Sequence, residues 1–217
     1  MSTAKIDRSQ TESARITVPF PEPRSLRGPI LPVFIPFYGC PRRCVFCAQD
    51  RQTGTGSPTL DQILERLRSD LDQTGAPMAV GIFGGTFTAL PERWRTAFLA
   101  CIDPYKKKGI VTHVRCSTRP DTVSIRELER MRKMGLDMVE FGAQTFDDDC
   151  LSRSNRGHGR SEILAACAMV RQAGLELGLQ LMPGIPGQTP DGFHRDVDQA
   201  IALGPDIVRL YPCLALK

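Results

Sequence analysis

Residues 34–47 read FIPFYGCPRRCVFC and place Cys40, Cys44 and Cys47 within eight residues. They overlap an apolar run, residues 30–37, that has the length and composition of a buried strand. Thiol side chains grouped this closely in one short segment are typical of a metal site. The segment therefore predicts a strand that ends in a metal-binding loop.

The spacing Cys-x3-Cys-x2-Cys restricts which metal this loop can hold. Thiolates are soft ligands that suit zinc, copper(I) and iron-sulfur clusters. A structural zinc site is closed by four ligands, and the next candidates along the chain are as distant as Cys101 and His113. A cubane cluster normally takes four thiolates, so three of them leave one iron open. We expect a 4Fe-4S cluster, with a zinc site completed from afar or three incidental buried cysteines as the alternatives.

The pattern Cys40-x3-Cys44-x-Phe46-Cys47, with an aromatic residue before the last cysteine, resembles the signature of the radical S-adenosylmethionine (radical SAM) superfamily. This resemblance implies that the open iron chelates the methionyl part of S-adenosylmethionine. It also implies that one electron from the reduced cluster cleaves the sulfonium bond to a 5′-deoxyadenosyl radical, which abstracts hydrogen from a substrate. A one-electron reductant of the flavodoxin or ferredoxin type is then an expected partner.

Composition sets the broad class of the protein. The chain has 217 residues, of which 41% are hydrophobic, and this is enough for one sizeable core. It has neither a long apolar run nor a signal-peptide core, so we expect a cytoplasmic protein with no membrane partner. A net charge of +4 permits a nucleic-acid partner without indicating one. The other cysteines are spaced singly, and we expect small reduced core residues at Cys101, Cys116, Cys150, Cys167 and Cys213.

Strand-like and helix-like segments alternate along the rest of the chain. Apolar runs predict strands at residues 30–37, 78–83, 110–116, 138–141, 175–182 and 207–210. Helical segments between them begin at signals near residues 59, 91, 124, 147, 161 and 189. Apolar strands separated by amphipathic helices imply a parallel α/β sheet. The spacing allows a barrel or an open doubly wound sheet, and the superfamily resemblance implies a partial (β/α)6 barrel.

Side-chain patterns predict the buried face of one helix and the exposed end of another. In the last helix we expect Phe193, Val197 and Ile201 to share a buried face. Residues 106–108 are three consecutive lysines, which we expect to form a solvated helix end that complements the helix dipole.

The two ends of the chain differ in character. Residues 1–27 are polar and proline-containing, so we expect an extended arm, followed by a single radical SAM core over residues 28–217. Residues 211–217 are too few to supply a helix that covers the sixth strand. We therefore expect a core truncated after the sixth strand, as a fragment of a longer protein, with the alternative that the N-terminal arm covers that edge.

A glycine turn follows the second predicted strand. Gly84, Gly85 and Thr86 come directly after residues 78–83, and glycines allow a ligand to approach the backbone closely. The turn resembles the superfamily's strand-two glycine motif, which holds the amino group of the methionyl part. Thr86 stands where many members have glutamate.

Polar side chains follow the third and fourth predicted strands, at the edge where reactive groups collect in parallel barrels. Arg119 suits a carboxylate, or alternatively forms a salt bridge with Asp121. Gln144 suits a ribose hydroxyl, or alternatively acts as a turn amide. Arg156 and His158 share the later loop NRGH, where a lone histidine is more often exposed or a helix cap than a catalyst.

Four segments together resemble the radical domain of the Elongator catalytic subunit and its bacterial relatives: residues 117–121, 140–144, 155–158 and 181–187. The resemblance implies a possible role in tRNA wobble-uridine modification. The wider group includes oxygen-independent coproporphyrinogen oxidases, whose cofactor contacts carry over to Gln144 and Arg156. This chain departs from those oxidases at Ser117, in place of a ribose-binding glutamate, and at Gln180, in place of a strand-five aspartate.

These observations predict a radical SAM enzyme with an unidentified substrate, to which we assign no catalytic side chain. Porphyrinogen oxidation is the alternative reaction, and a zinc-stapled RNA-binding module without catalysis is the alternative of another class. The cluster ligands are expected to be Cys40, Cys44 and Cys47. The expected contacts to S-adenosylmethionine are Phe46, Gly84, Gly85, Thr86, Gln144, Arg156 and Gln180.

Overall fold

Six parallel strands make up the centre of the structure. The computed structural model describes residues 28–49 and 58–213. The strands are β1 (Ile30–Phe34), β2 (Met78–Phe83), β3 (Val111–Thr118), β4 (Met138–Gln144), β5 (Glu176–Leu181) and β6 (Ile207–Leu210). They lie side by side in chain order, and each neighbouring pair is parallel. A doubly wound sheet reverses its strand order partway, so the partial (β/α)6 barrel is confirmed and the open-sheet alternative is wrong.

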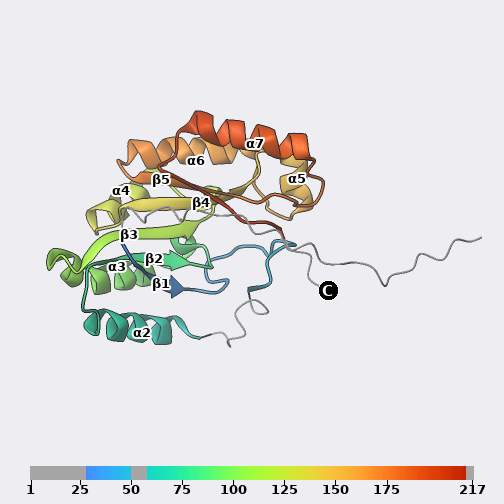
Figure 1. The fold of residues 1–217 in the computed structure, drawn as a ribbon. Helices are drawn as coiled ribbons and strands as arrows, with labels where there is room; N and C mark the ends of the chain where they lie inside the picture. Colours follow the sequence, from blue (N-terminus) through green and yellow to red (C-terminus); the bar gives the residue numbers. More distant parts are fainter. Residues whose placement is uncertain (1–27, 50–57, 214–217) are drawn as a thin grey trace, which may run out of the picture.

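Helices connect the strands and cover one side of the sheet. They are α2 (Leu60–Asp72), α3 (Glu92–Lys107), α4 (Ile125–Lys133), α5 (Asp148–Arg153), α6 (Arg160–Gln172) and α7 (Pro190–Leu203), with short 3-10 turns η1 (Phe87–Ala89) and η2 (Pro120–Thr122). Figure 1 shows them along the outside of the curved sheet, from α2 beside β1 to α6 and α7 beside β5. The loops that follow the strands therefore meet at the rim of the half-barrel.

Local sequence signals explain where these helices begin. Thr59 and Gln62 form a capping box at the start of α2: the Thr59 hydroxyl accepts from Gln62 N at 3.2 Å, and the Gln62 amide oxygen accepts from Thr59 N at 2.9 Å. Such a cap satisfies donors that the first helical turn leaves unpaired. Ser124 and Thr189 cap α4 and α7 with their hydroxyls in the same way.

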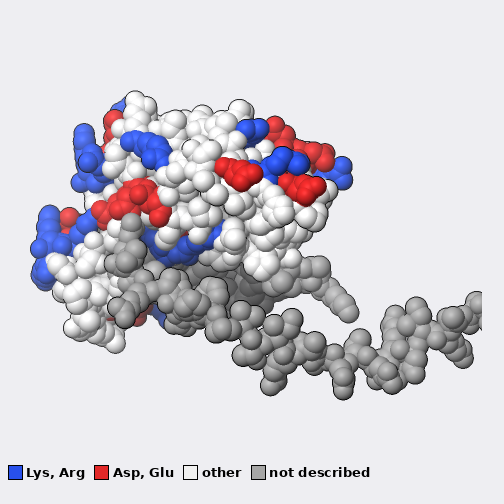
Figure 2. All heavy atoms as spheres, turned by 45° about the horizontal axis from the view of Figure 1, so that its top comes forward, with Lys and Arg blue, Asp and Glu red and all other residues white. Residues whose placement is uncertain are grey.

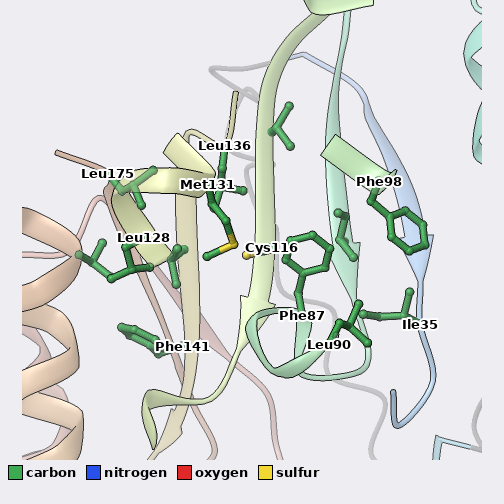
Figure 3. Close-up of a cluster of buried hydrophobic side chains, with 14 of the residues drawn as sticks. Ile35, Phe87, Leu90, Phe98, Cys116, Leu128, Met131, Leu136, Phe141 and Leu175 are labelled. Atoms are coloured by element: carbon green, nitrogen blue, oxygen red, sulfur yellow. The ribbon is translucent and has the colours of Figure 1, made fainter. Parts of the chain in front are cut away.

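The hydrophobic core fills the space between the sheet and the helices. In Figure 3, Cys116 of β3 lies between one group that contains Phe87 and Phe98 and another that contains Leu128 and Phe141. All five side chains are completely buried. The rings of Phe87 and Phe98 meet edge to face, with centroids 6.3 Å apart. Burial of one such phenylalanine contributes about 2 kcal/mol, so this core holds the strand ends, and the loops after them, in place.

Strand lengths differ from the predicted ones near the functional edge. β1 stops at Phe34, because the chain turns back at Phe37, whose φ is 58° and whose carbonyl accepts from Cys40 N at 3.0 Å. β3 continues to Thr118 and β4 to Gln144, beyond their apolar runs. At the end of β3, the side chains of Ser117 and Thr118 have hydrogen-bond partners in Gln180 and Thr88, which the hydrophobic pattern does not show.

Three side-chain expectations are wrong. Ile201 of α7 is 67% exposed, while the buried positions of that helix include Asp196. Lys107 and Lys108 are exposed at the end of α3 as expected, but Lys106 is not merely solvated, because its ammonium donates to the Gly135 carbonyl at 2.7 Å and to the Asp137 carboxylate at 2.6 Å. Cys101 and Cys213 are only half-buried, whereas the remaining three single cysteines are buried as expected.

The remaining observations concern membrane-spanning helices and the edges of the described region. None of the helices in residues 28–49 and 58–213 is both long and apolar enough to cross a bilayer. Within these residues β6 pairs with β5 alone, and Val208 and Leu210 are 44% and 55% exposed. The expected N-terminal arm, residues 1–27, lies outside the described residues.

Candidate cluster and cofactor site

The loops at the C-terminal ends of the strands enclose a cavity of about 580 Å³. Because parallel strands end at the same edge of a sheet, loops that follow all six strands contribute to its wall. The ten residues predicted to hold the cluster or the cofactor all line this cavity: Cys40, Cys44, Cys47, Phe46, Gly84, Gly85, Thr86, Gln144, Arg156 and Gln180.

Backbone and side-chain hydrogen bonds fix the cysteine loop. Cys47 N donates to Cys44 O at 3.0 Å, which makes a tight turn between two of the thiols. Val45 N donates to Ser154 O at 3.3 Å, and the Asn155 side chain donates to Arg43 O at 2.8 Å. The loop after β1 is therefore attached to the loop after α5, although more than a hundred residues separate them in the sequence.

Two of the thiols have polar partners from other loops. The Cys44 sulfur lies 3.1 Å from Arg156 Nη1, and the Cys40 sulfur lies 3.2 Å from Thr86 Oγ1. Burial, followed by the neighbouring Cys44 and Cys40, raises the pKa of Cys47 to about 11. A protonated thiol is the stable form there until a metal replaces the proton.

This donor set suits a cluster. Three soft thiolates with a guanidinium beside one of them provide ligands and compensate charge. The residues present fit a 4Fe-4S cluster.

The glycines after β2 have a different immediate role from the expected one. A Cβ atom on Gly85 would lie 2.3 Å from Tyr38 O and 2.5 Å from Ile35 O, and one on Gly84, whose φ is 97°, would meet the Phe34 ring at 2.5 Å. These glycines thus let the cysteine loop pack against the turn. Gln49, which the sequence interpretation missed, joins the two segments: its amide donates to Gly84 O, and its oxygen accepts from Phe37 N at 2.9 Å.

Gln144 has an unusual backbone conformation at the end of β4. Its φ is 72°, a left-handed value that costs a non-glycine residue about 1–3 kcal/mol. The pairing of β4 with β5 is interrupted between Gly142 and Gln144, so a local irregularity turns this residue toward the cavity. The side-chain oxygen Oε1 is buried and has no hydrogen-bond partner among the described residues. Both features point to a residue that is positioned for a ligand.

Arg119 and His158 form a buried network at the rim of the cavity. Arg119 donates to both carboxylate oxygens of Asp121, at 2.9 and 2.8 Å, so the salt-bridge alternative describes this residue in the structure. His158 is buried, against expectation, and its Nδ1 lies 3.3 Å from Asp121 Oδ1. Burial lowers the pKa of His158 against the opposing effect of Asp121. Burial would raise the pKa of Asp121, but hydrogen bonds from His158 and Arg119 outweigh it and hold the pKa well below its usual value.

Gln180 belongs to a polar network on the floor of the cavity. Its amide nitrogen donates to Ser117 Oγ at 3.2 Å and to Glu140 Oε1 at 2.5 Å. Glu140 is fully buried on β4, where Arg209 of β6 and Arg115 of β3 pair with its other oxygen at 3.3 and 3.7 Å. Sequence patterns carry no signal for the Glu140 and Arg209 contacts, because their partners come from other strands.

Comparisons with known proteins agree with this arrangement. The family model described as the radical SAM superfamily matches residues 34–200. The chain is 28% identical to the heme chaperone HemW of Bacillus subtilis over 187 residues, which are 82% of this chain and 48% of that protein. It is also 28% identical to the tRNA uridine(34) acetyltransferase of Dehalococcoides mccartyi over 217 residues, covering 82% of this chain and 47% of that protein. The chain spans about half the length of these curated relatives.

Solved structures share the fold. Coproporphyrinogen III oxidase (HemN) from Escherichia coli superimposes with a TM-score of 0.65 at 22% identity, over 88% of this chain and 45% of that one. The archaeal Methanocaldococcus infernus Elp3 gives a TM-score of 0.64 at 22% identity, over 88% of this chain and 47% of that one. Because the family match runs from the end of β1 into α7 and covers more than half of the sequence, the chain belongs to the radical SAM superfamily.

Proposed function

We propose that this chain binds a 4Fe-4S cluster through Cys40, Cys44 and Cys47 and binds S-adenosylmethionine beside it. The observation that carries the proposal is that ten residues chosen from separate loops line one cavity. When bound and reduced, the cluster supplies the electron that cleaves the cofactor to a 5′-deoxyadenosyl radical for hydrogen abstraction. The protein supplies ligands, orientation and a sheltered space.

Individual side chains have distinct tasks in this proposal. Arg156, which is buried and touches Cys44, balances the negative charge of the thiolates. Gln144 offers its unpartnered oxygen to a hydroxyl or amine of the cofactor. Phe46 covers the cavity wall next to Cys47, and the backbone of Gly84 and its neighbours contacts the methionyl part.

For the substrate we propose a tRNA uridine, with porphyrinogen oxidation as the alternative. The motifs of residues 155–158 and 181–187 support tRNA, as does the similarity to a tRNA uridine(34) acetyltransferase. The floor of the cavity supports the same choice, because Ser117 and Gln180, which replace the two acidic positions of the oxidases, are uncharged and hydrogen-bonded to each other. The oxidase pattern of ribose contacts is thus missing at both positions.

Reduction of the proposed cluster requires one electron from a donor outside the cluster itself. We propose a one-electron donor of the flavodoxin or ferredoxin type in the cytoplasm. Arg42 and Arg43 are exposed on the cysteine loop, and the Arg43 guanidinium lies over the Phe37 ring. An acidic donor is complementary to such a surface.

The test is anaerobic reconstitution of the full chain with iron and sulfide, followed by reduction with S-adenosylmethionine present. We expect about four irons per chain and release of 5′-deoxyadenosine. Cys44→Ala should lose the cluster, whereas Cys101→Ala, which removes a half-buried thiol outside the cavity, should keep it. A colourless protein that holds zinc and yields no 5′-deoxyadenosine would instead support the RNA-binding module.

A further inference from the structure

Asp196 is a buried carboxylate on α7 whose hydrogen bonds reach two loops of the cavity wall. It is 2% exposed, and its two carboxylate oxygens accept from neutral donors. Burial of a carboxyl group is costly unless donors satisfy its oxygens. The donors that do so identify what this residue holds in place.

All three donors come from the loops after β4 and β5. Asp196 Oδ2 accepts from the Thr145 hydroxyl at 2.7 Å and from the Gln188 amide at 2.9 Å. Asp196 Oδ1 accepts from the backbone N–H of Phe146 at 2.7 Å. Gln188 in turn accepts from Gly184 N at 2.7 Å through its own oxygen. One carboxylate thereby joins both loops from the outer side of the sheet.

β4 ends at Gln144, the residue with the left-handed backbone and with a buried Oε1 that has no hydrogen-bond partner among the described residues. Thr145 and Phe146 are the next two residues, so Asp196 fixes the backbone immediately after the strained position. On the other side, Gln144 O accepts from Met182 N at 2.9 Å, which ties the same residue to the end of β5. A backbone segment that is held on both sides can keep a conformation that its own preferences disfavour.

We propose that Asp196 is a positioning residue that acts through Gln144 on the binding of S-adenosylmethionine. The inference rests on the proposed function, since it assumes that Gln144 contacts that cofactor. Asp196 is not among the residues that line the cavity, whereas Cys40, Cys44 and Cys47 are. Its effect is therefore indirect, through backbone geometry.

The experiment measures the dissociation constant of S-adenosylmethionine for the reconstituted full chain, with iron content determined for each variant. Asp196→Asn replaces one carboxylate oxygen, an acceptor, by an NH2 group that would face other donors. We therefore expect S-adenosylmethionine to bind about tenfold more weakly, at unchanged iron content. The matched control is Asp198→Asn, an exposed carboxylate of the same helix, which should bind as the wild type does. Asp196→Glu, which retains both acceptors, should restore part of the loss.

A double-mutant cycle separates positioning from general destabilisation. Gln144→Gly removes the amide and tolerates the left-handed backbone, so adding Asp196→Asn to it should cause no further loss of binding. An equal loss in both backgrounds, or no loss from Asp196→Asn alone, would overturn the inference while leaving the proposed function intact. If the wild type does not bind S-adenosylmethionine, or if Gln144→Gly binds it normally, the proposed role of Gln144 itself is wrong.

Discussion

His158 shows how a single residue couples the rim of the cavity to pH. Its imidazole is buried between Asp121 and two arginines, Arg119 and Arg156, and burial lowers its pKa. The unfolded chain then binds more protons than the folded one as the pH falls toward the ordinary histidine value of 6.5 and below. Stability contributed by neutral His158 is thus present above that pH and lost below it.

We predict that His158→Asn reduces this pH dependence. Asparagine keeps a donor near the position of Nδ1 but takes up no proton. The measurement is the difference in melting temperature between about pH 7.5 and about pH 5.5, which should shrink in the variant. His194→Asn, on the exposed side of α7, should leave the wild-type difference unchanged. An undiminished difference in His158→Asn would mean that other groups control the transition.

The residues of the site that could be predicted from the sequence are those whose side-chain chemistry and position along the chain were enough to identify them. Cysteine spacing, strand-end position and the family resemblance are enough to predict that Cys44, Gln144 and Arg156 share one site, and all three line the cavity. Gln49 and Asp196 were missed because each acts on partners far away in the sequence. A polar residue whose partners are backbone groups of another loop leaves no periodic signal.

Among the elements, strand β4 depends on one buried charge. Glu140 pairs with Arg115 and Arg209 and accepts from Gln180, so it links β4 to β3, β5 and β6. Loss of that charge leaves two buried or half-buried guanidinium groups with less compensation. We predict that Glu140→Gln lowers the free energy of unfolding by about 3 kcal/mol, measured by denaturant titration.

The exposed Glu129 of α4 provides the control for this prediction. Glu129→Gln should change the free energy of unfolding by less than about 0.5 kcal/mol. Equal stability of the wild type and Glu140→Gln would show that the cost of desolvating the ionic network cancels its attraction, in which case the network serves orientation of Gln180 alone.

The same network explains why element boundaries were less predictable than element order. The apolar runs located all six strands, but β3 and β4 extend past them to Thr118 and Gln144. Ser117 lies in register with Glu140, and the Thr118 hydroxyl lies 2.5 Å from that of Thr88, so these polar residues continue the strands with partners from neighbouring segments. Hydropathy alone ends a strand where polarity begins, because it carries no information on cross-strand partners.

At the scale of the whole molecule, segments far apart in the sequence are joined at the edge of the sheet where the strands end. Figure 2 shows basic and acidic side chains interspersed over the side that carries α6 and α7. Sequence order and the resemblance were enough to predict the half-barrel, since consecutive strands became neighbours. They could not predict how the half-barrel is held across its mouth, where the loop after β1 meets the loop after α5.

Asn155 makes the side-chain part of that connection. Its φ is 54°, and its side-chain amide donates to Arg43 O at 2.8 Å. Arg43 lies between Cys40 and Cys44 in the sequence, so this hydrogen bond anchors the cysteine loop. We predict that Asn155→Gly, which tolerates the left-handed backbone but removes the amide, leaves initial iron content unchanged and accelerates iron loss to a chelator roughly tenfold. The physical reason is that a loop freed from its anchor opens more often and exposes the ligands.

The release rate is followed by absorbance of the iron–chelator complex under anaerobic conditions. Gln73→Ala, which removes an exposed amide beyond α2, should release iron at the wild-type rate. Asn155→Asp offers an oxygen where a donor is needed, so it should behave like the glycine variant or release iron faster. If both Asn155 variants retain iron as the wild type does, the backbone contact from Val45 to Ser154 is enough to hold the loop, and the cluster is protected without the amide.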